Sequence, residues 1–135
     1  MKKTNMPAIN GPTNPSAAHA RNMRIQRFGA VIGLKPARER YYRELHANAW
    51  PTVIARLRKS HIRNFSIFIT SIAGRTYLFN YFEHVGAGLA ADLRAIATDP
   101  ETRRWWKETD PCQIPLPTRK PGANWSTMEQ VFYMK

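Results

Sequence analysis

The sequence predicts one domain of the α+β class, with strands and helices in the order β-α-β-β-α-β. Two long segments carry apolar residues every three to four positions, as amphipathic helices do, and shorter segments between them alternate as strands do. A very short turn joins two of the strand-like segments, which is typical of a hairpin. The 135 residues are enough for one buried core, and a single cysteine excludes a disulfide framework.

The first strand and the first helix are predicted near the N-terminal end of this domain. Residues 24–34 form a strand whose apolar residues gather toward its end, and Pro36 suits the first turn of a helix. Residues 37–60 then form an amphipathic helix. Because Pro51 removes one helical hydrogen bond, we expect this helix to bend or split near Ala49. The apolar stripe of the helix consists of Tyr41, Leu45, Ala49, Val53 and Leu57.

A hairpin and a second helical region follow. Two strands, residues 64–70 and 76–82, flank a turn at residues 73–75. The later elements are expected to be a helix over 89–97 that stops at Asp99–Pro100, one or two helical turns around 101–107, a proline-rich loop over 110–125 and a strand over 128–134. This order is that of the ferredoxin-like fold. Because its helices cover one face of the sheet, we expect a homodimer packed sheet against sheet.

The N-terminal segment differs in composition from the rest of the chain. Residues 1–22 contain three prolines and no hydrophobic period, so we expect a disordered tail before a single domain over residues 23–135. The tail lacks the apolar core of a secretory signal, and no apolar run is long enough for a membrane helix. These features predict a cytoplasmic protein.

The chain is strongly basic, with 21 Lys and Arg against 9 Asp and Glu and a net charge of +12. Such an excess is typical of proteins that bind polyanions. The basic residues are nevertheless spread over the tail, the first helix and the proline-rich loop. Helical arginines alternate with Glu39 and Glu44, as on a solvated surface. A nucleic-acid partner is therefore not favoured, although nonspecific binding remains an alternative.

Two residue pairs have spacings that suit chemistry. Tyr42 and His46 are four apart on the predicted helix, so a phenol and an imidazole share one face and can act as an acid–base pair. The alternative is a tyrosine at the core edge and a solvated histidine. Trp105 and Trp106 cannot point the same way in a helix, so one can enter the core while the other lines a sugar-binding cavity; both can also be core residues.

Other chemical classes find no support in the sequence. No two histidines or carboxylates have metal-ligand spacing on one element, so no metal is predicted. A phosphate-binding loop and a dinucleotide fingerprint are also lacking, so no cofactor is predicted. Cys112 has no nucleophile signature around it.

Several of these residues form a longer pattern. The string Tyr42-x-x-x-His46-x-x-x-Trp50-Pro51, followed by Asn64-Phe65-Ser66-Ile67, Trp105-Trp106 and Val131-Phe132-Tyr133, resembles the L-rhamnose mutarotase family over residues 24–134. The resemblance implies a dimeric α+β barrel of ferredoxin-like subunits. It also implies a cofactor-independent isomerase of carbohydrate metabolism, which interconverts the α and β anomers of a 6-deoxyhexose by acid–base ring opening and closure.

The resemblance also implies roles for individual residues. His46 falls on the family's catalytic proton donor, Tyr42 on a sugar-binding tyrosine, and Trp105 and Trp106 on the tryptophan pair that contacts the sugar. Phe65 stands where the rhamnose enzymes have a second sugar-binding tyrosine. Thr52 likewise replaces a glutamate that usually follows the Trp-Pro pair.

The proline-rich loop points toward a related sugar. The run Gln113-Ile114-Pro115-Leu116-Pro117 and the later Trp125-Ser126-Thr127-Met128 look more like relatives associated with L-fucose. We therefore expect L-rhamnose or L-fucose as substrate, with Gln113 as a contact for a sugar hydroxyl. The alternative, favoured by Phe65 and Thr52, is a non-catalytic sugar-binding or regulatory protein of the same fold.

Overall fold

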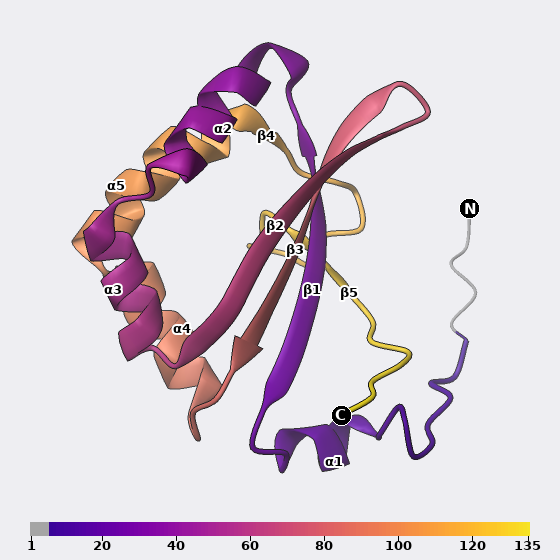
Figure 1. Ribbon diagram of the computed structural model, residues 1–135. Helices are drawn as coiled ribbons and strands as arrows, with labels where there is room; N and C mark the ends of the chain where they lie inside the picture. The colour runs from indigo at the N-terminus through magenta and orange to yellow at the C-terminus, as the bar shows by residue number, and fades with distance from the viewer. Residues whose placement is uncertain (1–5) are drawn as a thin grey trace.

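The computed structural model describes residues 6–135, and its elements follow the predicted order (Figure 1). The strands are β1 (Gln26–Leu34), β2 (Ile62–Ile72), β3 (Arg75–His84), β4 (Gln113–Ile114) and β5 (Ser126–Met128). The α-helices are α1 (Ala17–Arg21), α2 (Glu39–Ala47), α3 (Pro51–Lys59), α4 (Leu89–Thr98) and α5 (Pro100–Thr109). Two short 3₁₀ helices are η1 (Pro36–Arg38) and η2 (Asp110–Cys112).

The strands form one antiparallel sheet in the order β2-β3-β1-β4. The short strands β4 and β5 both pair with β1, β4 at residues 33–34 and β5 at residues 29–31. Together they occupy the place of the last strand of a ferredoxin-like sheet. The α+β prediction of the β-α-β-β-α-β order is therefore confirmed, with each helix of that scheme divided into two.

The predicted break in the first helix is confirmed at Pro51. Helix α2 ends at Ala47, and α3 begins with Pro51 in its first turn. A proline is tolerated there because the first N–H groups of a helix have no partner within the helix. The break lets α3 run in a new direction along the sheet (Figure 1).

The predicted hairpin is also confirmed, with a two-residue turn. Ala73 and Gly74 both have positive φ, at 51° and 77°, as a type I′ turn requires. Near the other end of β2 the pairing register shifts between Arg63 and Ser66, and Asn64 has φ of 50°. Because of this bulge, Ile62 before it and Phe65 after it lie on the same side of the sheet.

The C-terminal prediction was wrong in detail. The last strand is β5 (Ser126–Met128), not residues 128–134, which have no regular secondary structure after Met128. The chain there leaves the sheet edge and meets the N-terminal segment, where the Tyr133 N–H donates to the Thr13 carbonyl at 2.6 Å. Helix α5 is ten residues long, more than the predicted one or two turns. Asp99 caps it by accepting a hydrogen bond from the Thr102 N–H.

Part of the predicted tail lies outside the described residues. Residues 1–5 belong to that part, and residues 17–21 form the single-turn helix α1, whose first turn is capped by Ser16. The boundary of the domain at residue 23 stays a prediction. Within residues 6–135, no helix combines the length and the apolar character needed to cross a bilayer.

Helices cover one face of the sheet and leave the other face exposed (Figure 1). Helices α2 to α5 lie on one side of it (Figure 1), and the core forms beneath them. This core consists of Ile32, Leu34, Tyr42, Leu78 and Cys112. Side chains at the alternate strand positions project from the other face. Its exposed apolar residues are Phe68, Ile72, Ile114 and Met128.

Candidate active site

His46 is held by its own helix. Its Nδ1 lies 2.8 Å from the backbone carbonyl oxygen of Tyr42, one turn earlier in α2. Because a carbonyl can only accept, the ring carries its hydrogen on Nδ1 and keeps a bare lone pair on Nε2. The imidazole also stacks on the Tyr42 ring, with centroids 4.1 Å apart and planes 27° apart. The predicted pair on one helix face is therefore in direct contact.

Trp105 closes the other side of the imidazole. Its ring centroid lies 5.2 Å from that of His46 in an edge-to-face arrangement, and the Trp105 side chain is buried. Trp50, which precedes α3, meets Trp105 in the same way at 5.2 Å. The histidine is thus held between Tyr42 and Trp105, with Trp50 behind the indole. Edge-to-face aromatic contacts of this kind fix ring orientation.

Two hydrogen bonds between helices place α5 against the first helical layer. The Tyr41 hydroxyl donates to Glu108 at 2.6 Å, which ties α2 to the end of α5. The Thr52 hydroxyl donates to Glu101 at 3.3 Å, which ties α3 to the start of α5. Thr52, the departure from the family's glutamate, therefore takes part in positioning the helix that carries Trp105.

Burial sets the protonation of both groups. It raises the pKa of the Tyr42 phenol to about 12, with the hydrogen bond from Gln113 acting in the opposite direction. Burial also lowers the pKa of His46 below its usual value, against the smaller effect of the bond to the Tyr42 carbonyl. At neutral pH the tyrosine therefore keeps its proton and the histidine is neutral, with Nε2 able to accept one.

Gln113 joins this group through Tyr42. It lies buried on β4, opposite Leu34 of β1, and its Nε2 donates to the Tyr42 hydroxyl at the long distance of 3.5 Å. The tyrosine oxygen is thus an acceptor for Gln113 and retains its own hydrogen for another partner. The sequence predicted Gln113 as a sugar contact, and the structure brings it to the tyrosine predicted to bind the sugar.

Trp106 and Phe65 have different surroundings. Trp106 follows the buried Trp105 but is 38% exposed, so the two indoles point differently, as the sequence predicted. Phe65 lies on β2 and stacks on Phe82 at 5.6 Å, which in turn stacks on Phe28 at 5.0 Å. In the β1–β3 pairing, Phe28 and Phe82 share the side of Ile32 and Leu78, the side covered by the helices.

Two further residues lie near or beneath the helices beside the predicted site. Trp50 continues the four-residue spacing of Tyr42 and His46, and it contacts Trp105. Asn80 lies on β3 between Leu78 and Phe82, on the side of the sheet that the helices cover, and its buried Oδ1 has no hydrogen-bond partner within residues 6–135. Nothing in the sequence pattern around Asn80 distinguishes it from a strand residue facing solvent.

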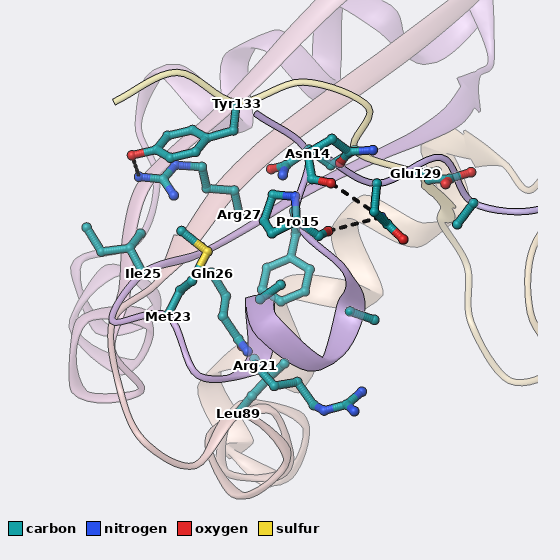
Figure 2. Close-up of a pocket in the computed structure, with 16 residues that line it drawn as sticks. Asn14, Pro15, Arg21, Met23, Ile25, Gln26, Arg27, Leu89, Glu129 and Tyr133 are labelled. Carbon is teal, nitrogen blue, oxygen red and sulfur yellow. Dashed lines mark hydrogen bonds between the residues drawn. The ribbon is translucent and has the colours of Figure 1, made fainter. Parts of the chain in front are cut away.

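A separate hollow lies at the other end of the molecule. Its volume is about 370 Å³, and it is an open hollow bordered by the N-terminal segment, the start of β1 and the C-terminal segment (Figure 2). Arg27 crosses its wall and donates to the Tyr133 hydroxyl at 3.0 Å. Its lining, as far as the structure describes it, includes none of the six residues predicted to form the sugar site.

The fold is that of a ferredoxin-like α+β protein, and beneath its helices a histidine lies between two aromatic rings. The family model of L-rhamnose mutarotase matches residues 27–134. The chain therefore belongs to the L-rhamnose mutarotase family, and it is an isomerase that acts on a sugar by mutarotation. The predicted family resemblance is confirmed.

Individual relatives match about four fifths of the chain. The chain is 27% identical to an L-rhamnose mutarotase of Lactiplantibacillus plantarum, over 80% of this chain and 97% of the relative. It is 26% identical to one of Listeria monocytogenes, over 82% and 99%. A crystal structure of an L-rhamnose mutarotase from Formosa agariphila matches with a TM-score of 0.60 and 22% identity, over 82% of this chain and 99% of that one. This last likeness supports the fold.

Proposed function

We propose that this protein interconverts the α and β anomers of a 6-deoxyhexose, L-rhamnose first and L-fucose second, with His46 as the group that moves the proton. The observation that carries the proposal is the hydrogen bond from His46 Nδ1 to the Tyr42 carbonyl, which leaves Nε2 bare. The names of the two bacterial relatives support L-rhamnose as the first substrate to test.

The proposed reaction starts from a neutral imidazole. His46 Nε2 takes the proton of the C1 hydroxyl, the bond from C1 to the ring oxygen breaks, and a second group gives the ring oxygen a proton. The open aldehyde then turns about its C1–C2 bond. On closure the hydroxyl oxygen bonds again to C1 and its proton returns to the second group. The imidazolium returns its proton to the former carbonyl oxygen, so His46 is the proton donor in this half of the cycle. Positioned groups of this kind each contribute roughly 10² to 10⁴ in rate.

Tyr42 is the proposed partner of the histidine. Its phenol keeps its proton at neutral pH because burial raises its pKa to about 12. The hydroxyl can therefore donate to a sugar oxygen while it accepts from Gln113. We assign it to sugar positioning or proton relay, and Gln113 to holding the phenol and contacting a sugar hydroxyl.

The aromatic residues supply the apolar part of the proposed sugar site. A 6-deoxyhexose has a methyl group at C6 and apolar C–H faces, and aromatic rings pack well on such surfaces. Trp105 beside His46 is proposed as the first of these rings, with Trp106 and Phe65 as further contacts. Because Phe65 lacks a hydroxyl, we expect one sugar hydroxyl to lose a partner that the rhamnose enzymes provide.

Anomer exchange measured by saturation-transfer NMR tests the proposal. We expect the protein to accelerate anomer exchange of L-rhamnose or L-fucose at neutral pH. The substitution His46→Ala should lower the catalysed exchange rate by a factor of about 10² to 10⁴. The matched control is His19→Ala, an exposed histidine in α1. No acceleration for any 6-deoxyhexose would contradict the proposed substrate class. Tight sugar binding without acceleration would select the non-catalytic sugar-binding alternative, which Phe65 and Thr52 favour.

We also propose that two copies pack through the face of the sheet opposite the helices. The support is the set of apolar side chains that this face exposes, among them Phe68 at 63% and Ile72 at 52%. Exposed apolar patches of this kind are typical of protein interfaces. Light scattering should give the mass of a dimer, and Phe68→Asp should shift it toward the monomer; a monomeric wild-type protein would refute this assembly. The proposed location is the cytoplasm.

A further inference from the structure

A second group of ionisable side chains lies apart from the proposed sugar site. His61 Nδ1 and His84 Nε2 both contact Oδ2 of Asp92, at 2.9 Å and 2.7 Å. The three ligand atoms lie within 4.8 Å of one another. The residues come from three elements: His61 follows α3, His84 ends β3, and Asp92 lies in the first turn of α4. The prediction that no metal binds considered spacings on one element only, so it did not include this group.

The surrounding backbone is built around these side chains. His61 has φ of 61°, in the left-handed region that residues other than glycine rarely adopt. Gly86 approaches the group so closely that a Cβ there would lie 2.8 Å from the His61 ring and 2.9 Å from Asp92 Oδ2. The strained backbone at His61 and the lack of a side chain at Gly86 therefore both serve to bring the imidazole to the carboxylate.

The solvent exposure of the three side chains increases from His84 to Asp92 to His61. The His84 side chain is fully buried, that of Asp92 is 19% exposed and that of His61 is 51% exposed. One ligand is thus fixed in the protein interior while the other two reach solvent. A site of this form has an entry path and an open position for water.

We propose that His61, His84 and Asp92 bind a divalent transition-metal ion, with Zn²⁺ as the first candidate. Two imidazole nitrogens and one carboxylate oxygen are ligands that Zn²⁺ takes, and water completes a tetrahedron. Bonds of about 2.0 to 2.1 Å place tetrahedral ligands about 3.3 Å apart. The two contacts in the structure are therefore about half an ångström too short for the bound state. To lengthen both, the partly exposed Asp92 carboxylate must move away from the buried His84 ring, and the half-exposed His61 ring must move outward.

The hydrogen bonding of the second ring nitrogen of His84 affects how strongly the metal ion would bind. Coordination through Nε2 puts the ring hydrogen on Nδ1, and Nδ1 has no hydrogen-bond partner in the part of the chain that the structure describes. A hydrogen-bond acceptor for the ring N–H of a metal-bound histidine typically raises metal affinity by about 10- to 100-fold. We therefore expect micromolar rather than nanomolar binding. A bound ion would connect the ends of α3 and β3 to the start of α4, and so stabilise the fold by linkage.

Titration of the full-length, untagged protein with ZnCl₂ tests the site by calorimetry, and CoCl₂ gives an independent reading through the visible absorbance of tetrahedral cobalt. We expect one ion per chain, a higher Tm with Zn²⁺, and affinity weakened at least about tenfold in His61→Ala and in Asp92→Asn. His61 is half exposed, so its substitution should leave the fold intact. His19→Ala and His46→Ala are the controls that should retain binding.

Three results would overturn the proposal. They are the absence of stoichiometric binding, equal affinity in wild-type, His61→Ala and Asp92→Asn proteins, and loss of binding in His46→Ala instead. In each case the histidines and Asp92 would be a hydrogen-bonded link between elements and no more. The readouts do not involve sugar, so failure here is distinct from failure of the proposed mutarotase reaction.

Discussion

The imidazole of His46 is hydrogen-bonded to the backbone carbonyl of Tyr42, at 2.8 Å, and stacked on the ring of the same residue. One residue thus fixes both the tautomer and the plane of the imidazole. The bare Nε2 is the chemical consequence, since the only hydrogen of the neutral ring is committed to the carbonyl. The proposed mechanism depends on this arrangement, because in it the ring accepts a proton first and donates it later.

The pH dependence of kcat/KM should show whether neutral or protonated His46 starts the reaction. Because burial lowers the pKa of His46 below its usual value of 6.5, the neutral form dominates at pH 7 and above. If the neutral form starts the reaction, kcat/KM is level from neutral to mildly alkaline pH. It should then fall as the pH drops through the lowered pKa. A profile that instead declines from acidic toward neutral pH would show that the imidazolium starts the reaction, contrary to the mechanism proposed.

Removal of the Tyr42 hydroxyl should distinguish the contribution of this residue to the reaction from its contribution to packing. Tyr42→Phe keeps the buried ring against His46 but removes the group that accepts from Gln113 and is proposed to donate to sugar. We expect the exchange rate to fall at least about tenfold, with a loss of about 1 kcal/mol in the free energy of unfolding because the contact with Gln113 is long. Tyr41→Phe, which removes a hydroxyl bonded to Glu108, is the control. Equal rates in the two variants would argue against a role for Tyr42.

The two adjacent tryptophans should differ sharply in their contribution to stability. Trp105 is 7% exposed and packs on His46 and Trp50, so Trp105→Ala should lower the free energy of unfolding by about 3 to 5 kcal/mol. Trp106 is 38% exposed, and Trp106→Ala should cost about 1 kcal/mol or less. Urea unfolding followed by circular dichroism measures both. A similar loss in the two variants would contradict the packing described for α5.

Glycine at position 33 allows β4 to approach β1. A Cβ there would lie 2.9 Å from the carbonyl oxygen and 3.0 Å from the Cβ of Ile114. Gly33→Ala should therefore push β4 away, displace the neighbouring Gln113 and lower the free energy of unfolding by about 1 to 3 kcal/mol. Gly11→Ala is the control because a Cβ there meets nothing within 4 Å. Thermal unfolding that is unchanged in both variants would show that this strand pairing is dispensable.

The sequence predicted the main elements because their signals are local. Pro51 divided the helix and Ala73–Gly74 closed the hairpin, each through a backbone preference of the residue itself. The terminal strand was misplaced because its alternating residues do not show which of them reach β1. That depends on Gly29, which leaves room for Met128 across the pairing.

The site was predictable only where its residues share one helix. The spacing of Tyr42 and His46 predicts that both lie on one face of the same helix, and the family pattern implied a role for Trp105. The contacts of Trp105 with His46 and Trp50 join separate helices, and the stacking of Phe65 on Phe82 joins separate strands. The cluster of His61, His84 and Asp92 could not be foreseen for the same reason, since three separate elements bring it together.

The most direct test of the account is chemical rescue of His46→Ala during anomer exchange at neutral pH. We predict that this variant loses most of the acceleration toward L-rhamnose or L-fucose, and that added imidazole restores part of it in proportion to the free base present. An undiminished rate in His46→Ala, or a slow variant with intact fold that imidazole leaves unchanged, would contradict the central claim that this ring carries the proton.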